Sequence, residues 1–142
     1  MPVDHPDELR RILTDIRTLA LVGASDKENR DSYRVMAYLQ GRGYRVIPVS
    51  PRLAGKTLLG ETVYDSVSAI PDAIDMVDVF LNPSRLAPVV DEAIASKARI
   101  LWLQLGVINE AEAARAEAAG MTVVMDHCPK MEIPRLGVPP IR

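Results

Sequence analysis

A glycine-containing turn near the start of the chain has the residue types of a phosphate-binding loop. Residues 18–22 form a short apolar run of strand length, and residues 23–25, Gly-Ala-Ser, come directly after it. The N-terminus of a helix that follows such a turn attracts anions, because its first backbone N–H groups have no partner within the helix. Ser25 can donate to a phosphate, and so can the backbone N–H groups of Ser32 and Tyr33 at the expected start of the helix, where Asp31 or Ser32 would be the N-cap.

The loop departs from the dinucleotide-binding pattern G-x-G-x-x-G. After Gly23, that pattern requires glycines at positions 25 and 28, where this chain has Ser25 and Glu28. Glycine there lets the backbone approach a pyrophosphate closely. We therefore expect this chain to hold phosphate through a longer loop with hydroxyl and backbone donors.

The end of the next apolar run, residues 44–50, narrows the choice of nucleotide. A domain that binds NAD usually ends this strand with Asp or Glu, which accepts hydrogen bonds from the ribose. Here the run ends in Ser50, Pro51 and Arg52, and Lys56 follows four residues later. Two cations and no carboxylate favour a nucleotide with an additional phosphate on its ribose. NADP and coenzyme A (CoA) both have one.

One segment imitates a different phosphate motif. Gly55, Lys56 and Thr57 resemble the end of G-x-x-x-x-G-K-T, but Ser50 occupies the first glycine position. Residues 58–60 do not have the pattern of a helix start. A nucleoside-triphosphate cradle is therefore not expected.

The remaining reactive side chains suggest no catalytic centre. His127 and Cys128 are adjacent, but neighbours on a strand point to opposite faces, so adjacency does not make a nucleophile and its base. We expect Cys128 to be a packing residue, and Asp75, Asp78 and Asp126 to cap loops or pair with basic residues. No histidines and carboxylates have metal-ligand spacing.

The elements around these loops alternate. Apolar periodicity predicts helices over residues 5–16 (with Asp4 as N-cap), 32–40, from 83 onward and 110–119, and strands that end near residues 23, 50, 81, 105 and 125. The pattern predicts one Rossmann-like α/β domain over residues 1–142. We expect three αβα layers around a doubly wound parallel sheet of about five strands, in the order 3-2-1-4-5. Residues 1–17 would be an N-terminal helix, and the prolines of residues 128–142 predict an irregular C-terminal arm.

Composition sets outer limits on function. The 142 residues have a formal net charge of −2, six aromatic residues counted as four Tyr, one Trp and one Phe, and a single cysteine. A nucleic-acid-binding protein would usually be basic, so we expect no nucleic-acid partner. No apolar run has the length of a membrane span, and the acidic N-terminus does not resemble a signal peptide. One cysteine fits a reducing compartment, so a cytoplasmic location is expected.

Five blocks in order resemble the stand-alone bacterial CoA-binding domain proteins. They are residues 21–25, 43–51, 77–80, 101–106 and 132–136, and the resemblance covers nearly the whole chain. That family is similar in fold to the N-terminal domain of the succinyl-CoA synthetase α subunit. The synthetases also need a phosphorylated histidine from another domain and a nucleotide-grasp subunit, and by this resemblance the chain has neither.

The resemblance implies a domain that binds CoA or an acyl-CoA and is not an enzyme. For the pyrophosphate, the resemblance implies Gly23, Ala24 and Ser25. For the adenosine with its 3′-phosphate, it implies Ser50, Pro51, Arg52 and Lys56. For the pantetheine path, it implies Phe80, Asn82, Pro83, Gln104 and Gly106. Relatives often have an arginine directly after the fourth residue of the 77–80 block, where this chain has Leu81. Arg85 is the expected substitute.

Two other functions remain open from the sequence. One is an NADP-dependent oxidoreductase domain, and the other is an enzyme that handles acyl-CoA through Cys128. A homodimer through the apolar tail and the N-terminal helix is also compatible with the sequence.

Overall fold

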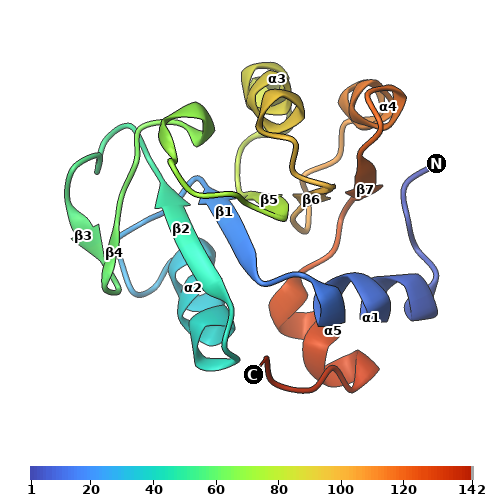
Figure 1. Cartoon of the computed structure of the whole chain (residues 1–142), viewed down its shortest axis with the longest axis horizontal. Helices are drawn as coiled ribbons and strands as arrows, with labels where there is room; N and C mark the ends of the chain where they lie inside the picture. Colours follow the sequence, from blue (N-terminus) through green and yellow to red (C-terminus); the bar gives the residue numbers. More distant parts are fainter. Residues whose placement is uncertain (142) are drawn as a thin grey trace.

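The computed structural model describes residues 1–141 and contains a five-stranded sheet between two layers of helices (Figure 1). Its elements, in order, are α1 (Pro6–Asp15), β1 (Thr18–Val22), α2 (Asp31–Gly41), β2 (Arg45–Val49), β3 (Thr57–Leu58), β4 (Glu61–Thr62), the 3₁₀ turn η1 (Val67–Ala69), β5 (Met76–Val79), the 3₁₀ turn η2 (Pro83–Arg85), α3 (Leu86–Ser96), β6 (Ile100–Leu103), α4 (Glu110–Ala118), β7 (Thr122–Val124) and α5 (Pro129–Leu136). No helix among these residues is both long and apolar enough to cross a membrane.

The sheet confirms the predicted fold class. All four strand pairings are parallel, as expected for a doubly wound α/β domain. Successive side chains along each strand point to opposite faces of the sheet. On β1, Leu19 and Leu21 pack in the layer of α1, α2 and α5, whereas Ala20 and Val22 pack in the layer of α3 and α4. The strands of this sheet are buried on both faces over most of their length, which explains their continuous apolar runs.

The predicted strand order is wrong. The observed order is β2-β1-β5-β6-β7, so the third long strand, β5, lies beside β1 and not outside β2. The outer side of β2 is instead used by the segment that follows it. Tyr64 forms a parallel bridge with Val49, its N–H donates to the Pro48 carbonyl at 3.1 Å, and its carbonyl accepts from the Ser50 N–H at 2.9 Å. This bridge occupies the edge that a third strand would need.

The order changes which loops are neighbours. The turn after β1 lies between the ends of β2 and β5, and the end of β6 is one strand further away. The expected crevice between the first and fourth long strands is therefore replaced by one between β1 and β5. The order in which strands are added to the sheet reverses between β1 and β5, and α/β domains bind ligands at the carboxyl edge beside such a point.

The C-terminal arm is partly helical, contrary to the prediction of irregular structure. Pro129 occupies the first position of α5, where a missing N–H costs nothing, and Pro134 lies inside the helix. Burial of Ile133 and contacts with α1 and α2 hold α5 in place. Tertiary packing thus outweighs the low helix propensity of proline.

Two helix starts also differ from the predictions. His5, not Asp4, caps α1, and its side chain accepts from the Asp7 N–H at 3.2 Å. Helix α2 begins at Asp31, and its N-cap residue Arg30 makes no side-chain capping hydrogen bond.

Candidate functional site: three adjoining hollows at the carboxyl edge

Gly23 is held in a conformation that other residues rarely adopt. Its φ is +89°, and a Cβ atom there would lie 2.2 Å from the carbonyl oxygen of Phe80. Its N–H and that of Ala24 donate to the Val49 carbonyl, both at 3.1 Å. The turn is therefore fixed between β2 and β5, and only glycine fits at its first position.

A polar hollow of about 450 Å³ lies between this turn and the start of α2. Three cations, two serines and one carboxylate contribute to its lining: Lys27, Arg30, Arg52, Ser25, Ser32 and Asp31. The first N–H groups of α2 have no partner within the helix and no capping side chain from Arg30, so the positive end of the helix adds to these cations. This combination suits an anion such as phosphate.

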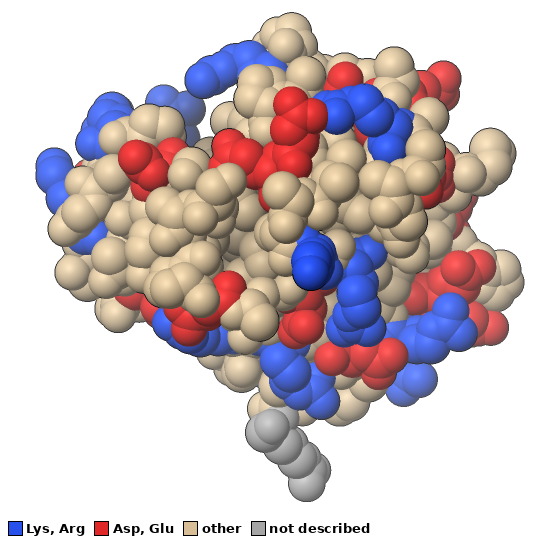
Figure 2. Space-filling model, turned by 45° about the horizontal axis from the view of Figure 1, so that its top comes forward, with Lys and Arg blue, Asp and Glu red and all other residues tan. Residues whose placement is uncertain are grey.

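The cations of this hollow are only partly neutralised. Arg52 lies 3.4 Å from the Asp26 carboxylate, and both side chains are largely exposed. Exposed pairs of this kind contribute little to stability, so Arg52 can exchange Asp26 for a ligand at small cost. On the face seen in Figure 2, basic and acidic side chains are interspersed, which suits a small ligand better than a polyanion.

A second hollow, of about 490 Å³, lies between the end of β2 and the start of α3. Gly23 and Ala24 border it on one side, and the end of β2 contributes Ser50 and Pro51. The rest of the lining combines apolar side chains such as Val89 with one cation, Arg85, and two carboxylates, Asp65 and Glu92. A mixed lining of this kind suits a heterocycle with polar substituents.

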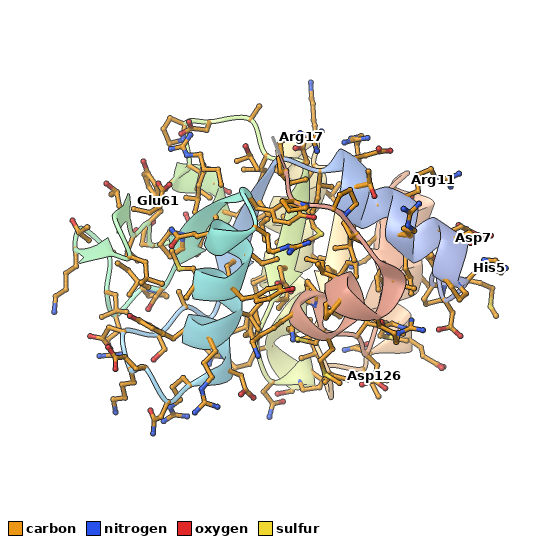
Figure 3. The ribbon with its side chains drawn as sticks, turned by 90° about the horizontal axis from the view of Figure 1, so that it is seen from below. His5, Asp7, Arg11, Arg17, Glu61 and Asp126 are labelled. Carbon is orange, nitrogen blue, oxygen red and sulfur yellow. The ribbon has the colours of Figure 1, made fainter. Side chains whose placement is uncertain are left out.

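A third hollow, of about 230 Å³, lies where α2 and α5 begin. Phe80, Gln104 and Cys128 are among its lining residues, together with Arg34 and Lys130. Figure 3 shows α2 and α5 side by side in front of the sheet, with Asp126 marking the carboxyl edge at which both helices start. The three hollows adjoin: the first and second share Gly23, and the first and third share Asp31 and Phe80.

The structure brings together nine of the residues named from the sequence. Those that line the hollows are Gly23, Ala24, Ser25, Ser32, Ser50, Pro51, Arg52, Phe80 and Gln104. Arg85, the expected substitute for the missing arginine, also lines the second hollow.

Five others lie outside these linings. Tyr33 packs against the core, and Lys56 lies in the exposed turn before β3. Asn82 caps η2 by accepting from the Ser84 N–H at 3.0 Å, and the Pro83 carbonyl accepts from the Asn109 amide at 3.1 Å.

The fifth, Gly106, donates its N–H to the Asp126 carboxylate at 2.8 Å. It therefore shapes the loop after β6 without bordering a hollow. Sequence reasoning missed the cationic lining residues Lys27, Arg30, Arg34 and Lys130, and it considered Cys128 only as a packing residue or as the nucleophile of an alternative enzyme. The polar run after Ser25 was a signal for the first two; only the fold places the others.

The side chains weighed for catalysis have other partners. His127 lies between two carboxylates, with Nδ1 2.8 Å from Glu132 Oε1 and Nε2 3.1 Å from Asp4 Oδ1. Neither of these two contacts involves the neighbouring Cys128. Within residues 1–141, no cluster of three or more His, Cys, Asp or Glu side chains could hold a metal ion.

Asp75, Asp78 and Asp126 were expected to cap loops or to pair with basic residues; Asp75 and Asp126 cap loops, and Asp78 does neither. Asp75 accepts from the backbone N–H groups of Arg17 and Thr18, and Asp126 accepts from Gly106. Asp78, predicted to cap or pair, is fully buried on β5 between Leu21 and Trp102, and neither carboxyl oxygen has a hydrogen-bond partner among the described residues. Burial raises the pKa of Asp78 well above its ordinary value.

Known proteins are similar to this chain over most of its length. YneT of Bacillus subtilis, which is uncharacterized, is 35% identical over 124 residues, covering 87% of this chain and 90% of YneT. A hypothetical protein from Pyrococcus horikoshii OT3 is 38% identical with a TM-score of 0.90, covering 96% of each chain. Cell-free ID.343 from Thermus thermophilus is 35% identical with a TM-score of 0.90, covering 94% of this chain and 99% of the other.

A larger protein contains the same fold. The dinucleotide-forming acetyl-coenzyme A synthetase 1 of Ca. Korarchaeum cryptofilum is 22% identical with a TM-score of 0.67, covering 81% of this chain but only 27% of the synthetase. At this identity the likeness shows the fold alone. The family model described as CoA binding domain matches residues 17–134, which include all three hollows, and the chain therefore belongs to the CoA-binding domain family.

Proposed function

We propose that this protein binds CoA or an acyl-CoA at the carboxyl edge of its sheet without transforming it, as a carrier or a sensor. The observation that carries the proposal is the set of adjoining hollows, one cationic, one mixed and one lined by an amide and a thiol. CoA has the same division into phosphates, adenosine and a pantetheine arm with amide groups.

The first loop would hold the pyrophosphate. In this assignment the Ser25 hydroxyl donates a hydrogen bond to a phosphate oxygen. The small residues Gly23 and Ala24 let the ligand approach the backbone closely beside the start of α2. Arg30 and Lys27 supply charge from the same hollow. Charge-assisted hydrogen bonds to phosphate contribute about 1.5–3 kcal/mol each, so these contacts would dominate the affinity.

The other two hollows would hold the remaining parts of the ligand. Ser50 and Pro51 would border the adenosine, and Arg52 would reach its 3′-phosphate from the adjoining polar hollow. Phe80 and Gln104 would flank the pantetheine arm. Lys56, Tyr33, Asn82, Pro83 and Gly106 would act from the periphery, by long-range charge or by shaping loops.

The absence of a catalytic role is part of the proposal. His127 is engaged by Glu132 and Asp4, which makes it a structural residue and not a free base. The buried Asp78 lines none of the three hollows, so it is not placed to exchange protons with a ligand there. We propose a cytoplasmic location on the composition alone.

The test begins with the small molecule that co-purifies with the protein, identified by mass spectrometry, followed by calorimetric titration with CoA, dephospho-CoA and NADP. Tight binding of CoA and weak or no binding of NADP supports the proposal. Tight NADP binding with saturable NADPH oxidation in the presence of an aldehyde would replace it with the oxidoreductase alternative.

Charge reversal in the polar hollow provides a matched control. Arg30→Glu should weaken CoA binding by about tenfold or more, because a cation beside the phosphates becomes an anion. Arg11→Glu makes the same change on α1 (Figure 3), where Arg11 borders none of the three hollows, and should leave the affinity unchanged. Equal losses in the two variants would contradict the location of the site.

A further inference from the structure

The third hollow contains two polar groups that the fold itself does not use. Gln104 is only 5% exposed, yet its Oε1 is buried without a hydrogen-bond partner among residues 1–141. A buried unpaired amide is costly, by about 1–3 kcal/mol, and such groups commonly meet a ligand or water. The amide lines the hollow, where a ligand amide would match its donor and acceptor.

Cys128 lines the same hollow and is the chain's single cysteine. It is 8% exposed and is the N-cap residue of α5, where no side-chain hydrogen bond involves it. Arg34 and Lys130 belong to the same lining. The thiolate is the nucleophilic form of cysteine, so a thiol in the wall of this hollow is the group there that can attack a disulfide.

The hollow is also placed at the right end of the proposed ligand. It adjoins the cationic hollow through Asp31 and Phe80, whereas the second hollow adjoins the cationic hollow through Gly23. A ligand whose phosphates lie at the start of α2 and whose adenosine lies between β2 and α3 would therefore direct its other end toward Gln104 and Cys128. In CoA that end is a thiol.

We propose that Cys128 captures CoA as a mixed disulfide, with CoA disulfide as the oxidant. The Cys128 thiolate attacks one sulfur of the CoA disulfide, a new Sγ–S bond forms, and the S–S bond of the disulfide breaks. One CoA leaves as its thiolate and takes up a proton, while the proton of the Cys128 thiol goes to solvent. Cys128 and the retained CoA end in the oxidised state, the released CoA is reduced, and a small thiol reverses the step.

This inference rests on the proposed function, and the experiment separates the two. Reduced wild-type protein is mixed with CoA disulfide or with glutathione disulfide, and intact-mass spectrometry follows the adduct with time. The expected adduct has the mass of the protein plus one CoA less two hydrogen atoms and disappears with dithiothreitol. Because binding places the disulfide beside the thiol, the CoA adduct should form about tenfold or more faster than the glutathione adduct.

Two variants serve as controls. Cys128→Ser should form no adduct with either disulfide. Cys128→Ser combined with Ala95→Cys carries a thiol at the exposed end of α3, close to the amino edge of the sheet, and should show no preference for CoA disulfide.

Each result has one reading. If wild type binds reduced CoA but reacts no faster with CoA disulfide than the Ala95→Cys control does, the capture step is wrong and the proposed function stands. If wild type does not bind reduced CoA at all, the proposed function fails. If Cys128→Ser still gains the mass of one CoA from CoA disulfide, the adduct does not form on Cys128 and the capture proposal is overturned.

Discussion

The space between Gly23 and Phe80 admits no side chain at position 23. A Cβ atom there would meet the Phe80 carbonyl oxygen at 2.2 Å and its carbonyl carbon at 3.0 Å, and the φ of +89° is itself unfavourable for other residues. The first loop of the candidate site is thus set by a backbone contact between the turn after β1 and the end of β5.

Gly23→Ala should therefore cost more than backbone strain alone. We expect the free energy of unfolding to fall by roughly 2–4 kcal/mol, because the alanine methyl group must displace the β5 backbone. Gly60→Ala is the control: its φ is +85°, but a Cβ there meets nothing within 4 Å. Its cost should be about 1–2 kcal/mol. Denaturant unfolding measures both, and equal costs would show that the contact with Phe80 relaxes freely.

Arg52→Glu should weaken CoA more than dephospho-CoA. We assign Arg52 to the 3′-phosphate, which dephospho-CoA lacks, so reversal of its charge should reduce CoA affinity by about 10- to 100-fold and dephospho-CoA affinity by less. Calorimetric titration of both ligands measures the difference. Lys56→Glu makes the same change outside the hollows and should have a smaller effect. Equal losses for the two ligands would place Arg52 on another group.

The fold class could be predicted because it depends on local patterns. Five apolar runs, each ended by a turn residue, alternate with helical periodicity, and this alternation leaves few architectures. Strand order depends on pairing between distant segments, about which periodicity carries no information. The chain nevertheless contains one clue. Pro48 has no N–H, and its carbonyl accepts from Tyr64 on the side of β2 away from β1. Because proline occurs in sheets mainly on edge strands, Pro48 indicates that β2 is an edge strand.

The candidate site was partly predictable for the same reason. Residues that end parallel strands, such as Ser25, Ser50 and Gln104, must meet at the carboxyl edge whatever the order of the strands. Loop shape and tail packing are not local properties. Cys128 enters the site only because α5 packs between α1 and α2, and the prolines of the tail predicted no helix there.

Asp78→Asn should change how stability depends on pH. The folded pKa of Asp78 is raised, so the native state keeps a proton that the unfolded chain releases above about pH 4. The contribution of Asp78 to stability is therefore complete at low pH and is lost as the pH rises toward the folded pKa, at up to about 1.4 kcal/mol per pH unit. Asparagine resembles the protonated carboxyl and does not titrate. Relative to wild type, the variant should gain stability as the pH rises from 4 to 8.

Denaturant unfolding at several pH values tests this, with Asp75→Asn as the contrast. Asp75 precedes the same strand, but its carboxylate accepts from Arg17 and Thr18, so its replacement should cost about 1–3 kcal/mol at neutral pH. If Asp78→Asn and wild type lost stability in parallel, Asp78 would not be the group that titrates.

Glu132 should show the opposite pH dependence. Burial raises its pKa, but hydrogen bonds from Arg135 and His127 outweigh burial, and the net pKa is lowered. A carboxyl with a depressed folded pKa contributes stability above its unfolded pKa, and that contribution is lost as the pH falls through the folded pKa. Glu132→Gln should therefore destabilise the protein by about 1–3 kcal/mol at pH 7, because α5 loses its pairing with His127 and Arg135. The difference from wild type should shrink below pH 4. Met131→Gln changes an exposed neighbour on the same helix and should leave unfolding nearly unchanged, whereas an equal loss there would mean that α5 responds to any substitution.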